Sequence, residues 1–309
     1  MALVDLDLDR ARNGLLRAAA AQIPPLAPPD IPLFTDTEEM LRVVAPDAVF
    51  IALPPTAHGA VEHACIDAGV PMMVQKPVAL DMDTAREIQR AAEARGLITS
   101  VGYQARYSSA VDAGMSALAD RTIGMAIGAY MGGLPRSRWW RMQAKSGGQV
   151  VEQATHVVDL MRYAVGEIAS VQATARTRLL TDVPDLDIAD VSVAMLEFEC
   201  GAIGTLLNTS ALHDVPGEDW NHGVTLIARD LSVRLWLSAA RIAEAGAVRT
   251  VQAVEDPMLS LDAAFIAAVA RNDPSGIRSS YADGAATLQV TLALEESVRM
   301  GRPVRPADV

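Results

Sequence analysis

The sequence predicts an α/β protein in which an incomplete, Rossmann-like doubly wound domain precedes an α+β domain with an open antiparallel sheet. In the first third of the chain, short apolar runs alternate with helical stretches, which is the pattern of βαβ units around a parallel sheet. From about Ile168 onward, long β-branched runs follow one another with little helix between them, which indicates antiparallel strands. The length of 309 residues suits roughly two domains at about 150 residues each. We place these domains at residues 1–103 and 104–309.

The predicted strands of the first domain are almost entirely apolar, as expected of strands that are covered by helices on both faces. They are Ala2–Val4, Ala48–Ala52, Pro71–Val74 and Leu97–Val101. The intervening helices are expected at Asp9–Ala21, Thr37–Val44, His58–Ala68 and Met82–Ala94. The proline-rich segment Ile23–Pro32 is expected to be a loop.

The second domain is expected to contain a run of strands followed by two helices. The strands are Ser170–Leu180, Val191–Cys200, Ile203–Leu212, Val224–Ala228 and Leu231–Leu237. The helices are Leu261–Ala270 and Tyr281–Met300, and the second one ends at Gly301 and Pro303.

The charge balance excludes several classes of function. The formal net charge is −12, and the sequence has no basic cluster of the kind that nucleic-acid binding requires. The acidic N-terminus does not resemble a secretory signal, and no apolar run approaches the roughly 18 residues of a membrane span. The two cysteines, Cys65 and Cys200, form no CxxC pair. We therefore expect a cytoplasmic protein that binds neither nucleic acid nor membrane.

Lys76 is the first candidate for chemistry, because it ends a buried strand in the segment Val74-Gln75-Lys76-Pro77. Ligands of open α/β sheets bind beyond the carboxyl ends of the strands, so Lys76 is expected to project into that crevice. There it would lose part of its solvation, which favours a role in proton transfer. The alternative is an ordinary solvated lysine at a strand end.

A second group of candidates lies in the block that begins at Gly147. Glu152, His156 and Asp159 are spaced i, i+4 and i+7, so on a helix they share one face within about 60° of arc. Histidine suits the removal of a proton from an alcohol near neutral pH, and a nearby carboxylate can orient the ring. Two alternatives stay open: solvated carboxylates with a core histidine, or a metal site, although the chain has no HExxH motif or thiolate cluster.

The order of motifs resembles the glucose-fructose oxidoreductase, inositol dehydrogenase and rhizopine-catabolism family, Gfo/Idh/MocA, over nearly the whole chain. The matching pieces are Ile51-Ala52-Leu53-Pro54-Pro55 with His58, Gln75-Lys76-Pro77, Gly102-Tyr103-Gln104 with Arg106-Tyr107, the block from Gly147 to Asp159, and Tyr281-Ala282-Asp283-Gly284. The resemblance implies a Rossmann domain, an open-faced antiparallel sheet and hydride transfer between NAD(P) and a sugar, inositol or related polyol.

The resemblance also implies a role for each catalytic candidate. Lys76 matches the lysine of the family's Glu-Lys-Pro motif and would polarise the substrate oxygen. His156 matches the catalytic histidine and would accept the hydroxyl proton while hydride leaves the same carbon. Glu152, where many members have aspartate, would hold the substrate or the imidazole. No metal is expected.

The expected cofactor is NAD, with NADP as the alternative. Asp5, or else Asp7, matches the acidic residue that bonds the adenosine ribose, and a carboxylate there disfavours a 2′-phosphate. The resemblance assigns the rest of the cofactor-binding set to the strand-end segments, where it comprises Leu53, Pro54, Pro55, His58, Gln75 and Lys76.

The chain departs from the family pattern in two places. Gln75 replaces the usual glutamate before the lysine, which removes a charge beside Lys76. The chain also starts at what resembles the family's second strand, so the first strand and its GxGxxG turn are expected to be missing. Either a normal oxidoreductase has been shortened, or the domain closes up; in both cases the sequence as written is expected to bind NAD weakly.

The expected partners are a small-molecule sugar or polyol and further copies of the chain. The substrate candidates are Arg106, Tyr107, Trp139, Trp140, Arg141 and Asp159. Tryptophan stacks on the apolar face of a sugar ring and arginine bonds hydroxyls or carboxylates; the alternative is a subunit or domain contact, where Trp and Arg are also enriched. Exposed strands of the second domain predict a homodimer or homotetramer. The rival functions are a non-catalytic sugar-binding or regulatory relative and a metal-assisted hydrolase or isomerase.

Overall fold

The parallel strands of the first third form two separate sheets in the computed structural model, which describes residues 1–20, 31–215 and 221–309. β1 (Leu3–Val4) pairs with β2 (Leu33–Phe34), and β4 (Met72–Val74) lies between β3 (Val49–Ile51) and β5 (Thr99–Val101). Among the described strands, β1 and β3 each have one edge that no strand occupies. The strands predicted for one doubly wound sheet therefore form two separate parallel sheets.

Four helices accompany these strands: α1 (Leu8–Ala20), α2 (Thr37–Val44), α3 (Ala60–Ala68) and α4 (Met82–Ala94). The predicted bounds of α2 and α4 are confirmed because their capping residues are explicit in the sequence. Asp36 and Asp81 each accept a hydrogen bond from a backbone N–H of the first turn. The predicted end of the first helix at Ala21 and most of the predicted loop Ile23–Pro32 lie outside the described residues.

The second half of the chain builds one eight-stranded sheet in the order β13-β12-β11-β10-β6-β9-β8-β7. The strands are β6 (Ile123–Met131), β7 (Ile168–Arg176), β8 (Val191–Phe198), β9 (Ile203–Thr209), β10 (His222–Ala228), β11 (Leu231–Trp236), β12 (Ala239–Glu244) and β13 (Ala247–Gln252). The prediction of a purely antiparallel sheet was wrong at one place, because β6 and β9 pair in parallel. Strand β6 itself was not predicted, since its alanines and glycines have low strand propensity.

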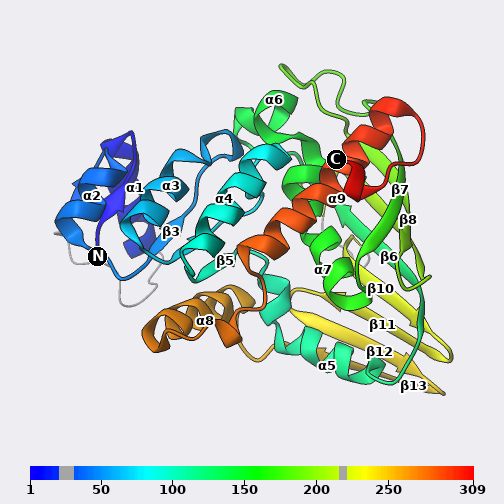
Figure 1. Ribbon diagram of the computed structural model, residues 1–309. Helices are drawn as coiled ribbons and strands as arrows, with labels where there is room; N and C mark the ends of the chain where they lie inside the picture. Colours follow the sequence, from blue (N-terminus) through cyan, green and yellow to red (C-terminus); the bar gives the residue numbers. More distant parts are fainter. Residues whose placement is uncertain (21–30, 216–220) are drawn as a thin grey trace.

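Helices cover one face of this sheet (Figure 1). α5 (Ser109–Leu118) packs on β11 and β12, and α7 (Thr155–Val165) packs on β6 and β10. Apolar side chains of β6, β8 and β9 on the other face remain exposed, among them Met125, Val193, Met195 and Ile203. The sheet is therefore closed on one side and open on the other.

The last two helices connect the two halves of the molecule. α8 (Pro257–Arg271) packs against the three-stranded sheet, where the rings of Phe265 and Phe50 meet edge to face with centroids 5.3 Å apart. α9 (Tyr281–Met300) contacts α4 and β5 on one side and α7 and β7 on the other (Figure 1). The C-terminal segment thus helps to complete the core of the first domain, and the boundary at residue 103 stays a prediction.

Candidate active site

Lys76 and Glu152 form a buried ion pair between the two halves of the molecule. Lys76 follows the carboxyl end of β4, as predicted, and its Nζ donates to Glu152 Oε1 at 2.9 Å and to the Glu152 backbone oxygen at 2.5 Å. The two side chains are only 11% and 5% exposed. A pair this well buried differs from a surface ion pair, because loss of either partner leaves an uncompensated charge in a low-dielectric setting.

Glu152 lies in a π-helical turn, Val150–Ala154, that leads directly into α7. Such turns are rare and occur frequently at functional sites, because the wider backbone redirects the side chains that it carries. The predicted common face of Glu152, His156 and Asp159 is therefore divided between two kinds of helix. Glu152 faces Lys76, whereas Asp159 faces a different cation, Arg106.

His156 sits in the first turn of α7, beside the aromatic ring of Tyr103. The two ring centroids are 6.0 Å apart in an edge-on arrangement, and the Tyr103 hydroxyl is 2.8 Å from Thr155 Oγ1. Burial, assisted by the positive charge of Lys76, lowers the pKa of His156 to about 3. The imidazole is therefore neutral at physiological pH and has a lone pair available for a proton.

Glu152 combines burial with unused hydrogen-bonding capacity. Burial raises the pKa of Glu152 to about 7, and the charges of Lys76 and His58 and the hydrogen bond from Lys76 limit the rise. Its Oε2 is buried without a hydrogen-bond partner among the described residues. A buried carboxylate oxygen without a hydrogen-bond partner carries a desolvation cost, and a substrate hydroxyl group is a natural donor to it.

Trp140 lies beside the ion pair, which places part of the predicted tryptophan segment at the site. The Lys76 Nζ is 5.4 Å from the centroid of the Trp140 ring, within the range of a cation–π contact. The rings of Trp139 and Trp140 lie 4.8 Å apart at 33°. Arg141 follows them, and its Nε is buried without a partner among the described residues.

Arg106 and Asp159 are placed differently from their predicted role in substrate contact. Asp159 accepts two hydrogen bonds from Arg106, at 2.7 and 2.9 Å, and a third from Thr287 at 3.0 Å. The two charged side chains are 6% and 1% exposed. The Tyr107 hydroxyl accepts a hydrogen bond from the Arg278 backbone N–H at 2.8 Å. The hydrogen bonds of these three side chains join separate elements of the fold, and the side chains do not line an open substrate site.

The expected ribose contacts Asp5 and Asp7 separate into two roles. Asp7 precedes α1, and its Oδ1 accepts from the backbone N–H groups of Asp9 and Arg10, each at 3.1 Å, so it caps the helix. Asp5 follows β1 with a side chain that is 28% exposed, and its Oδ1 accepts from the Asp7 backbone N–H at 2.8 Å. The same oxygen lies 3.6 Å from Arg10 Nε, so Asp5 is the candidate at the strand end but already has a cationic neighbour.

The other expected cofactor residues gather at the carboxyl ends of β3 and β4. Leu53 is half-buried, Pro54 is exposed and Pro55 is buried. Gln75 packs closely against the next strand end, where a Cβ on Gly102 would lie 2.5 Å from its Oε1. The His58 side chain is only 1% exposed and is bonded to Glu62, which turns it away from an open cofactor surface.

Sequence reasoning missed a row of polar side chains on the sheet. Tyr130 on β6 pairs in register with Asn208 on β9 and with His222 on β10. A Cβ on Gly128, two residues before Tyr130, would touch Val157 of α7, so this row lies on the α7 side of the sheet.

The Tyr130 member of this polar row lies within electrostatic range of Glu152. Burial and the charge of Glu152 raise the pKa of Tyr130. Asn208 Oδ1 is buried without a partner among the described residues, as are both amide atoms of Gln149. The row could be predicted only if β6 were recognised as a strand. The glycine and alanine content of β6 does not favour that prediction.

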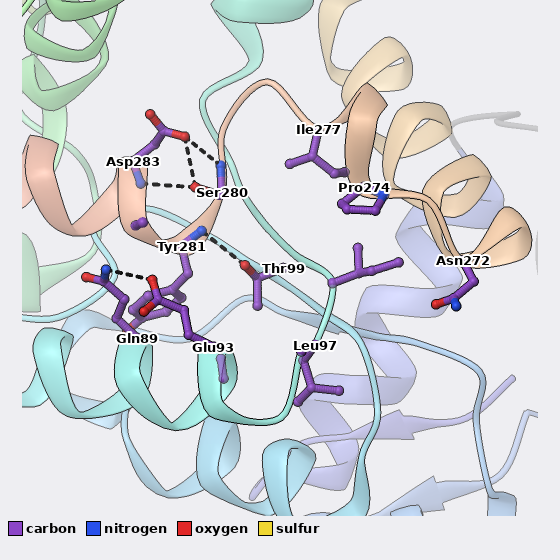
Figure 2. Close-up of a pocket in the computed structure, with 14 residues that line it drawn as sticks. Gln89, Glu93, Leu97, Thr99, Asn272, Pro274, Ile277, Ser280, Tyr281 and Asp283 are labelled. Carbon is purple, nitrogen blue, oxygen red and sulfur yellow. Dashed lines mark hydrogen bonds between the residues drawn. The ribbon is translucent and has the colours of Figure 1, made fainter.

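The cavity shown in Figure 2 is separate from the site around Lys76 and Glu152. It encloses about 490 Å³ between α4, the segment after α8 and the start of α9, and its wall includes Thr99 at the amino end of β5. Lys76 follows the carboxyl end of the neighbouring strand and is not part of this wall. Several polar groups in the wall are bonded to each other, for example Gln89 to Glu93 at 2.8 Å and the Ser280 N–H to Asp283 at 3.0 Å.

The described residues contain no cluster of three or more His, Cys, Asp or Glu side chains that could hold a metal ion. No helix in the described part of the chain is long and apolar enough to cross a membrane. Both cysteines are free, with Cys65 buried and Cys200 exposed. The metal-assisted alternative therefore has no ligand set within these residues.

The chain is similar to sugar and inositol oxidoreductases. It is 25% identical over 278 residues to a scyllo-inositol 2-dehydrogenase (NAD⁺) of Bacillus subtilis, covering 87% of this chain and 80% of the relative. It is 24% identical over 312 residues to an inositol 2-dehydrogenase of Rubrobacter xylanophilus, covering 98% and 84%. Among solved structures, a levoglucosan dehydrogenase in complex with NADH and levoglucosan superposes with a TM-score of 0.82 at 19% identity, over 98% of this chain and 89% of that one.

Two family models match consecutive parts of the chain. The oxidoreductase family with an NAD-binding Rossmann fold matches residues 13–103, and the GFO/IDH/MocA C-terminal domain matches residues 122–220. Together they span more than half of the sequence. The first model covers the segment with the parallel strands, and the second covers the first strands of the eight-stranded sheet. The chain belongs to the Gfo/Idh/MocA oxidoreductase family.

Proposed function

We propose that this protein is an NAD-dependent oxidoreductase that moves a hydride between a nicotinamide cofactor and the CH–OH carbon of a sugar, inositol or related polyol. The observation that carries the proposal is the convergence of Lys76, Glu152 and His156, from segments far apart in sequence, around a buried carboxyl group with a free oxygen. The inositol and levoglucosan dehydrogenases among the relatives support the same class of substrate.

The residues at the carboxyl ends of the parallel strands fit two parts of the cofactor. The partly exposed carboxylate of Asp5 suits the adenosine ribose hydroxyls and favours NAD over NADP. Ala52 and Pro54 are exposed after β3 and suit the nicotinamide side. None of the described strand-to-helix turns is glycine-rich. When bound, NAD⁺ supplies the acceptor for the hydride.

The chain's own residues account for the movement of the hydroxyl proton. His156 is neutral at physiological pH, so its imidazole can accept the proton of the substrate hydroxyl. Lys76 Nζ donates to Glu152, and we assign it the additional task of donating to the substrate oxygen. The negative charge that develops on that oxygen is stabilised by the ammonium group and promotes departure of the hydride.

Recognition of a polyol follows from the unpaired polar atoms around the ion pair. Glu152 Oε2, the Gln149 amide and Asn208 Oδ1 are buried and have no partner among the described residues. A compound with several hydroxyl groups can satisfy such atoms, whereas an apolar substrate would leave them unpaired at a cost of about 1–3 kcal/mol each. The Trp140 ring offers an apolar surface for the face of a sugar ring.

The open face of the large sheet supports a homodimer or homotetramer. Met125, Val193, Met195 and Ile203 are between 41% and 59% exposed on neighbouring strands. Apolar patches of this kind on a flat sheet are typical of subunit interfaces. Sedimentation velocity of the purified protein tests this assignment, and a monomer at all concentrations contradicts it.

The proposed activity is tested by following NADH formation with a panel of inositols, aldoses and anhydrosugars. We expect oxidation of at least one polyol with NAD⁺, and calorimetry of NADH binding measures the affinity for the cofactor directly. Binding of a polyol without binding of NADH or NADPH would instead support the non-catalytic relative. Activity that disappears on treatment with a chelator would support the metal-assisted alternative.

A further inference from the structure

The loop that connects β7 to β8, residues 177–190, is closed by a buried carboxylate. Asp190 at the end of the loop is 0% exposed and accepts hydrogen bonds from the consecutive backbone N–H groups of residues 178–180, with a shortest distance of 2.6 Å. Because the acceptor is charged, these bonds are stronger than bonds between neutral groups. The beginning and the end of the loop are therefore fixed to each other.

Asp187, within this loop, makes two hydrogen bonds to the part of the chain that follows Trp140. Its backbone N–H donates to the Arg141 carbonyl at 3.0 Å, and its Oδ1 accepts from the Gln143 backbone N–H at 2.5 Å. Gln143 begins α6 (Gln143–Ser146), whose own N-cap residue provides no side-chain acceptor. Asp187 therefore supplies, from a distant part of the sequence, an acceptor that the start of this helix lacks.

A second contact of the loop lies before the two tryptophans. Asp185 forms an ion pair with Arg138, the first residue of the tryptophan segment Arg138–Arg141. Both side chains are exposed, so this pair by itself contributes little to stability. Together with the two hydrogen bonds of Asp187, however, it attaches the tryptophan segment to the loop at both ends.

The attached stretch of chain connects two parts of the candidate active site. The Trp140 ring centroid lies 5.4 Å from Lys76 Nζ. After α6, the chain passes through Gly147 to the π-helical turn that carries Glu152, and the Gln143 side-chain amide donates to the Gly147 carbonyl at 2.9 Å. The position of this stretch therefore sets where the aromatic ring lies relative to the buried ion pair.

We propose that Asp187 is a positioning residue for substrate recognition. From the β7–β8 loop it fixes the end of the tryptophan segment, so that the Trp140 ring is held beside Lys76 before a substrate binds. An aromatic surface that is already in place lowers the ordering cost of binding and raises affinity without a part in the chemical step. This role in affinity rests on the proposed function, whereas the position of the ring does not.

The first test observes the Trp140 ring in the unliganded protein by fluorine NMR after labelling with 5-fluorotryptophan. The chain has four tryptophans, and Trp140→Phe identifies the Trp140 signal. Asp187→Ala removes the acceptor of the Gln143 N–H, and we expect the Trp140 signal to shift. Asp187→Asn keeps a side-chain oxygen that can accept the same bond, so it is expected to restore the wild-type signal. An unchanged Trp140 signal in folded Asp187→Ala overturns the proposal.

Asp182→Ala is the matched control. Asp182 is an exposed aspartate of the same loop that forms no hydrogen bond or ion pair within the described part of the chain. We expect its replacement to leave the Trp140 signal in place. A shift as large as that of Asp187→Ala would show that the signal responds to the charge of the loop and not to the hydrogen bond of Asp187, and it would also overturn the proposal.

The second test breaks the same hydrogen bond from the donor side. Gln143→Pro removes the backbone N–H at the first position of α6, where proline fits a helix, and the preceding residue already has the extended backbone that proline favours, with φ −110° and ψ 117°. Gln143→Ala is the control, because it deletes the side chain and keeps the N–H. We expect the Trp140 signal to move further in Gln143→Pro than in Gln143→Ala. Equal signals in the two variants contradict a role for this bond.

Steady-state kinetics tests whether the position of the ring matters to the substrate. We expect Asp187→Ala to raise KM for the polyol by about 2–5-fold, as for loss of the ring contact itself, and to change kcat by less than about 2-fold. In a Trp140→Ala background it is expected to cause no further rise in KM, because a residue that acts through the ring has no effect once the ring is gone. An unchanged KM, or equal rises in both backgrounds, overturns the role in recognition.

The NMR tests need neither cofactor nor substrate, so they are independent of the proposed activity. If the Trp140 signal responds as expected but the wild type oxidises no polyol, the proposed function fails while the positioning of the ring stands. If polyols are oxidised but the signal does not respond to Asp187→Ala, the proposed function stands and Asp187 has no positioning role. A lower urea midpoint without a change in the signal or in KM would indicate a merely structural role and would likewise overturn the proposal.

Discussion

Two buried ion pairs join the first half of the molecule to the segment around α7, and they differ in what they leave unsatisfied. Arg106 and Asp159 are saturated: the carboxylate accepts three hydrogen bonds, and the guanidinium also donates to the Arg278 carbonyl at 2.7 Å and to Asp283 at 3.1 Å. Lys76 and Glu152 are also buried, but one carboxylate oxygen has no partner among the described residues.

The difference shows how a structural pair is distinguished from one that is available to a ligand. Breaking a saturated buried pair lowers the stability of the protein, and the intact pair has no free hydrogen-bonding atom for a substrate. An unsaturated pair keeps hydrogen-bonding capacity in a low-dielectric setting, where an added hydroxyl group has the greatest effect. The comparison therefore predicts opposite phenotypes for the two pairs.

The largest expected effect is on turnover in the unsaturated region. Lys76→Ala and His156→Ala are each expected to lower kcat by about 10²–10⁴-fold, the usual contribution of general acid and base catalysis, with the fold retained. Initial rates of NADH formation and circular dichroism measure the two properties. The chain has only one other lysine, Lys145, which is exposed on α6 (Gln143–Ser146), so Lys145→Ala is the matched control. Normal turnover in both site variants would refute the assignment.

The saturated pair is expected to show its effect in stability. Asp159→Asn leaves the buried Arg106 with only the partly exposed Asp283 as a counter-charge, and it is expected to cost about 3–5 kcal/mol of the free energy of unfolding, measured by urea titration. Arg95→Ala, which removes an exposed partner of Asp67 at 3.4 Å, serves as the control and is expected to cost no more than about 1 kcal/mol. If the two variants are equally stable, the Arg106 and Asp159 pair does not stabilise the fold as predicted.

Glu295 on α9 extends the comparison to a half-buried carboxyl group that forms no ion pair within the described part of the chain. Burial raises its pKa from 4.5 to about 7, and a hydrogen bond from Gln143 at 3.5 Å lowers it only in part. The folded state then binds this proton more tightly than the unfolded chain, so the stabilisation is complete below about pH 4.5 and is lost as the pH rises through 7.

Glu295→Gln is expected to remove this loss of stability. The denaturation midpoint of the variant should equal that of the wild type near pH 4 and exceed it near pH 8, as measured by urea titration at both values. A variant that is less stable at the higher pH would show that the carboxylate has a favourable partner when ionised.

The smallest expected effect concerns the aromatic rings beside the cations. Each cation lies over a ring, Lys76 over Trp140 at 5.4 Å and Arg106 over Tyr163 at 5.2 Å. A cation–π contact contributes about 0.5–1 kcal/mol at a partly exposed site, so Trp140→Ala is expected to raise KM for the polyol by about 2–5-fold. Trp140→Phe keeps a ring and should restore most of the affinity. A larger fall in kcat than in affinity would instead place Trp140 in the chemical step.

Most helices could be predicted because the sequence signals that define them are local. The predicted Thr37–Val44, Met82–Ala94 and Tyr281–Met300 match α2, α4 and α9 residue for residue, since caps and apolar periodicity lie within each segment. Strand β6 could not be found in this way. Its glycines and alanines are used where α7 approaches closely, and that requirement exists only after the sheet and the helix have met.

The amino-acid sequence alone determined the fold class, the position of Lys76 at the end of a buried strand and the occurrence of acids and a histidine in one short block. Only the tertiary structure decided which acid serves which cation. The partners Lys76 and Glu152 are 76 residues apart, and Arg106 and Asp159 are 53 apart. Side-chain period and capping act over a few residues of chain, whereas pairing, saturation and proton affinity depend on burial and on neighbours that packing brings together.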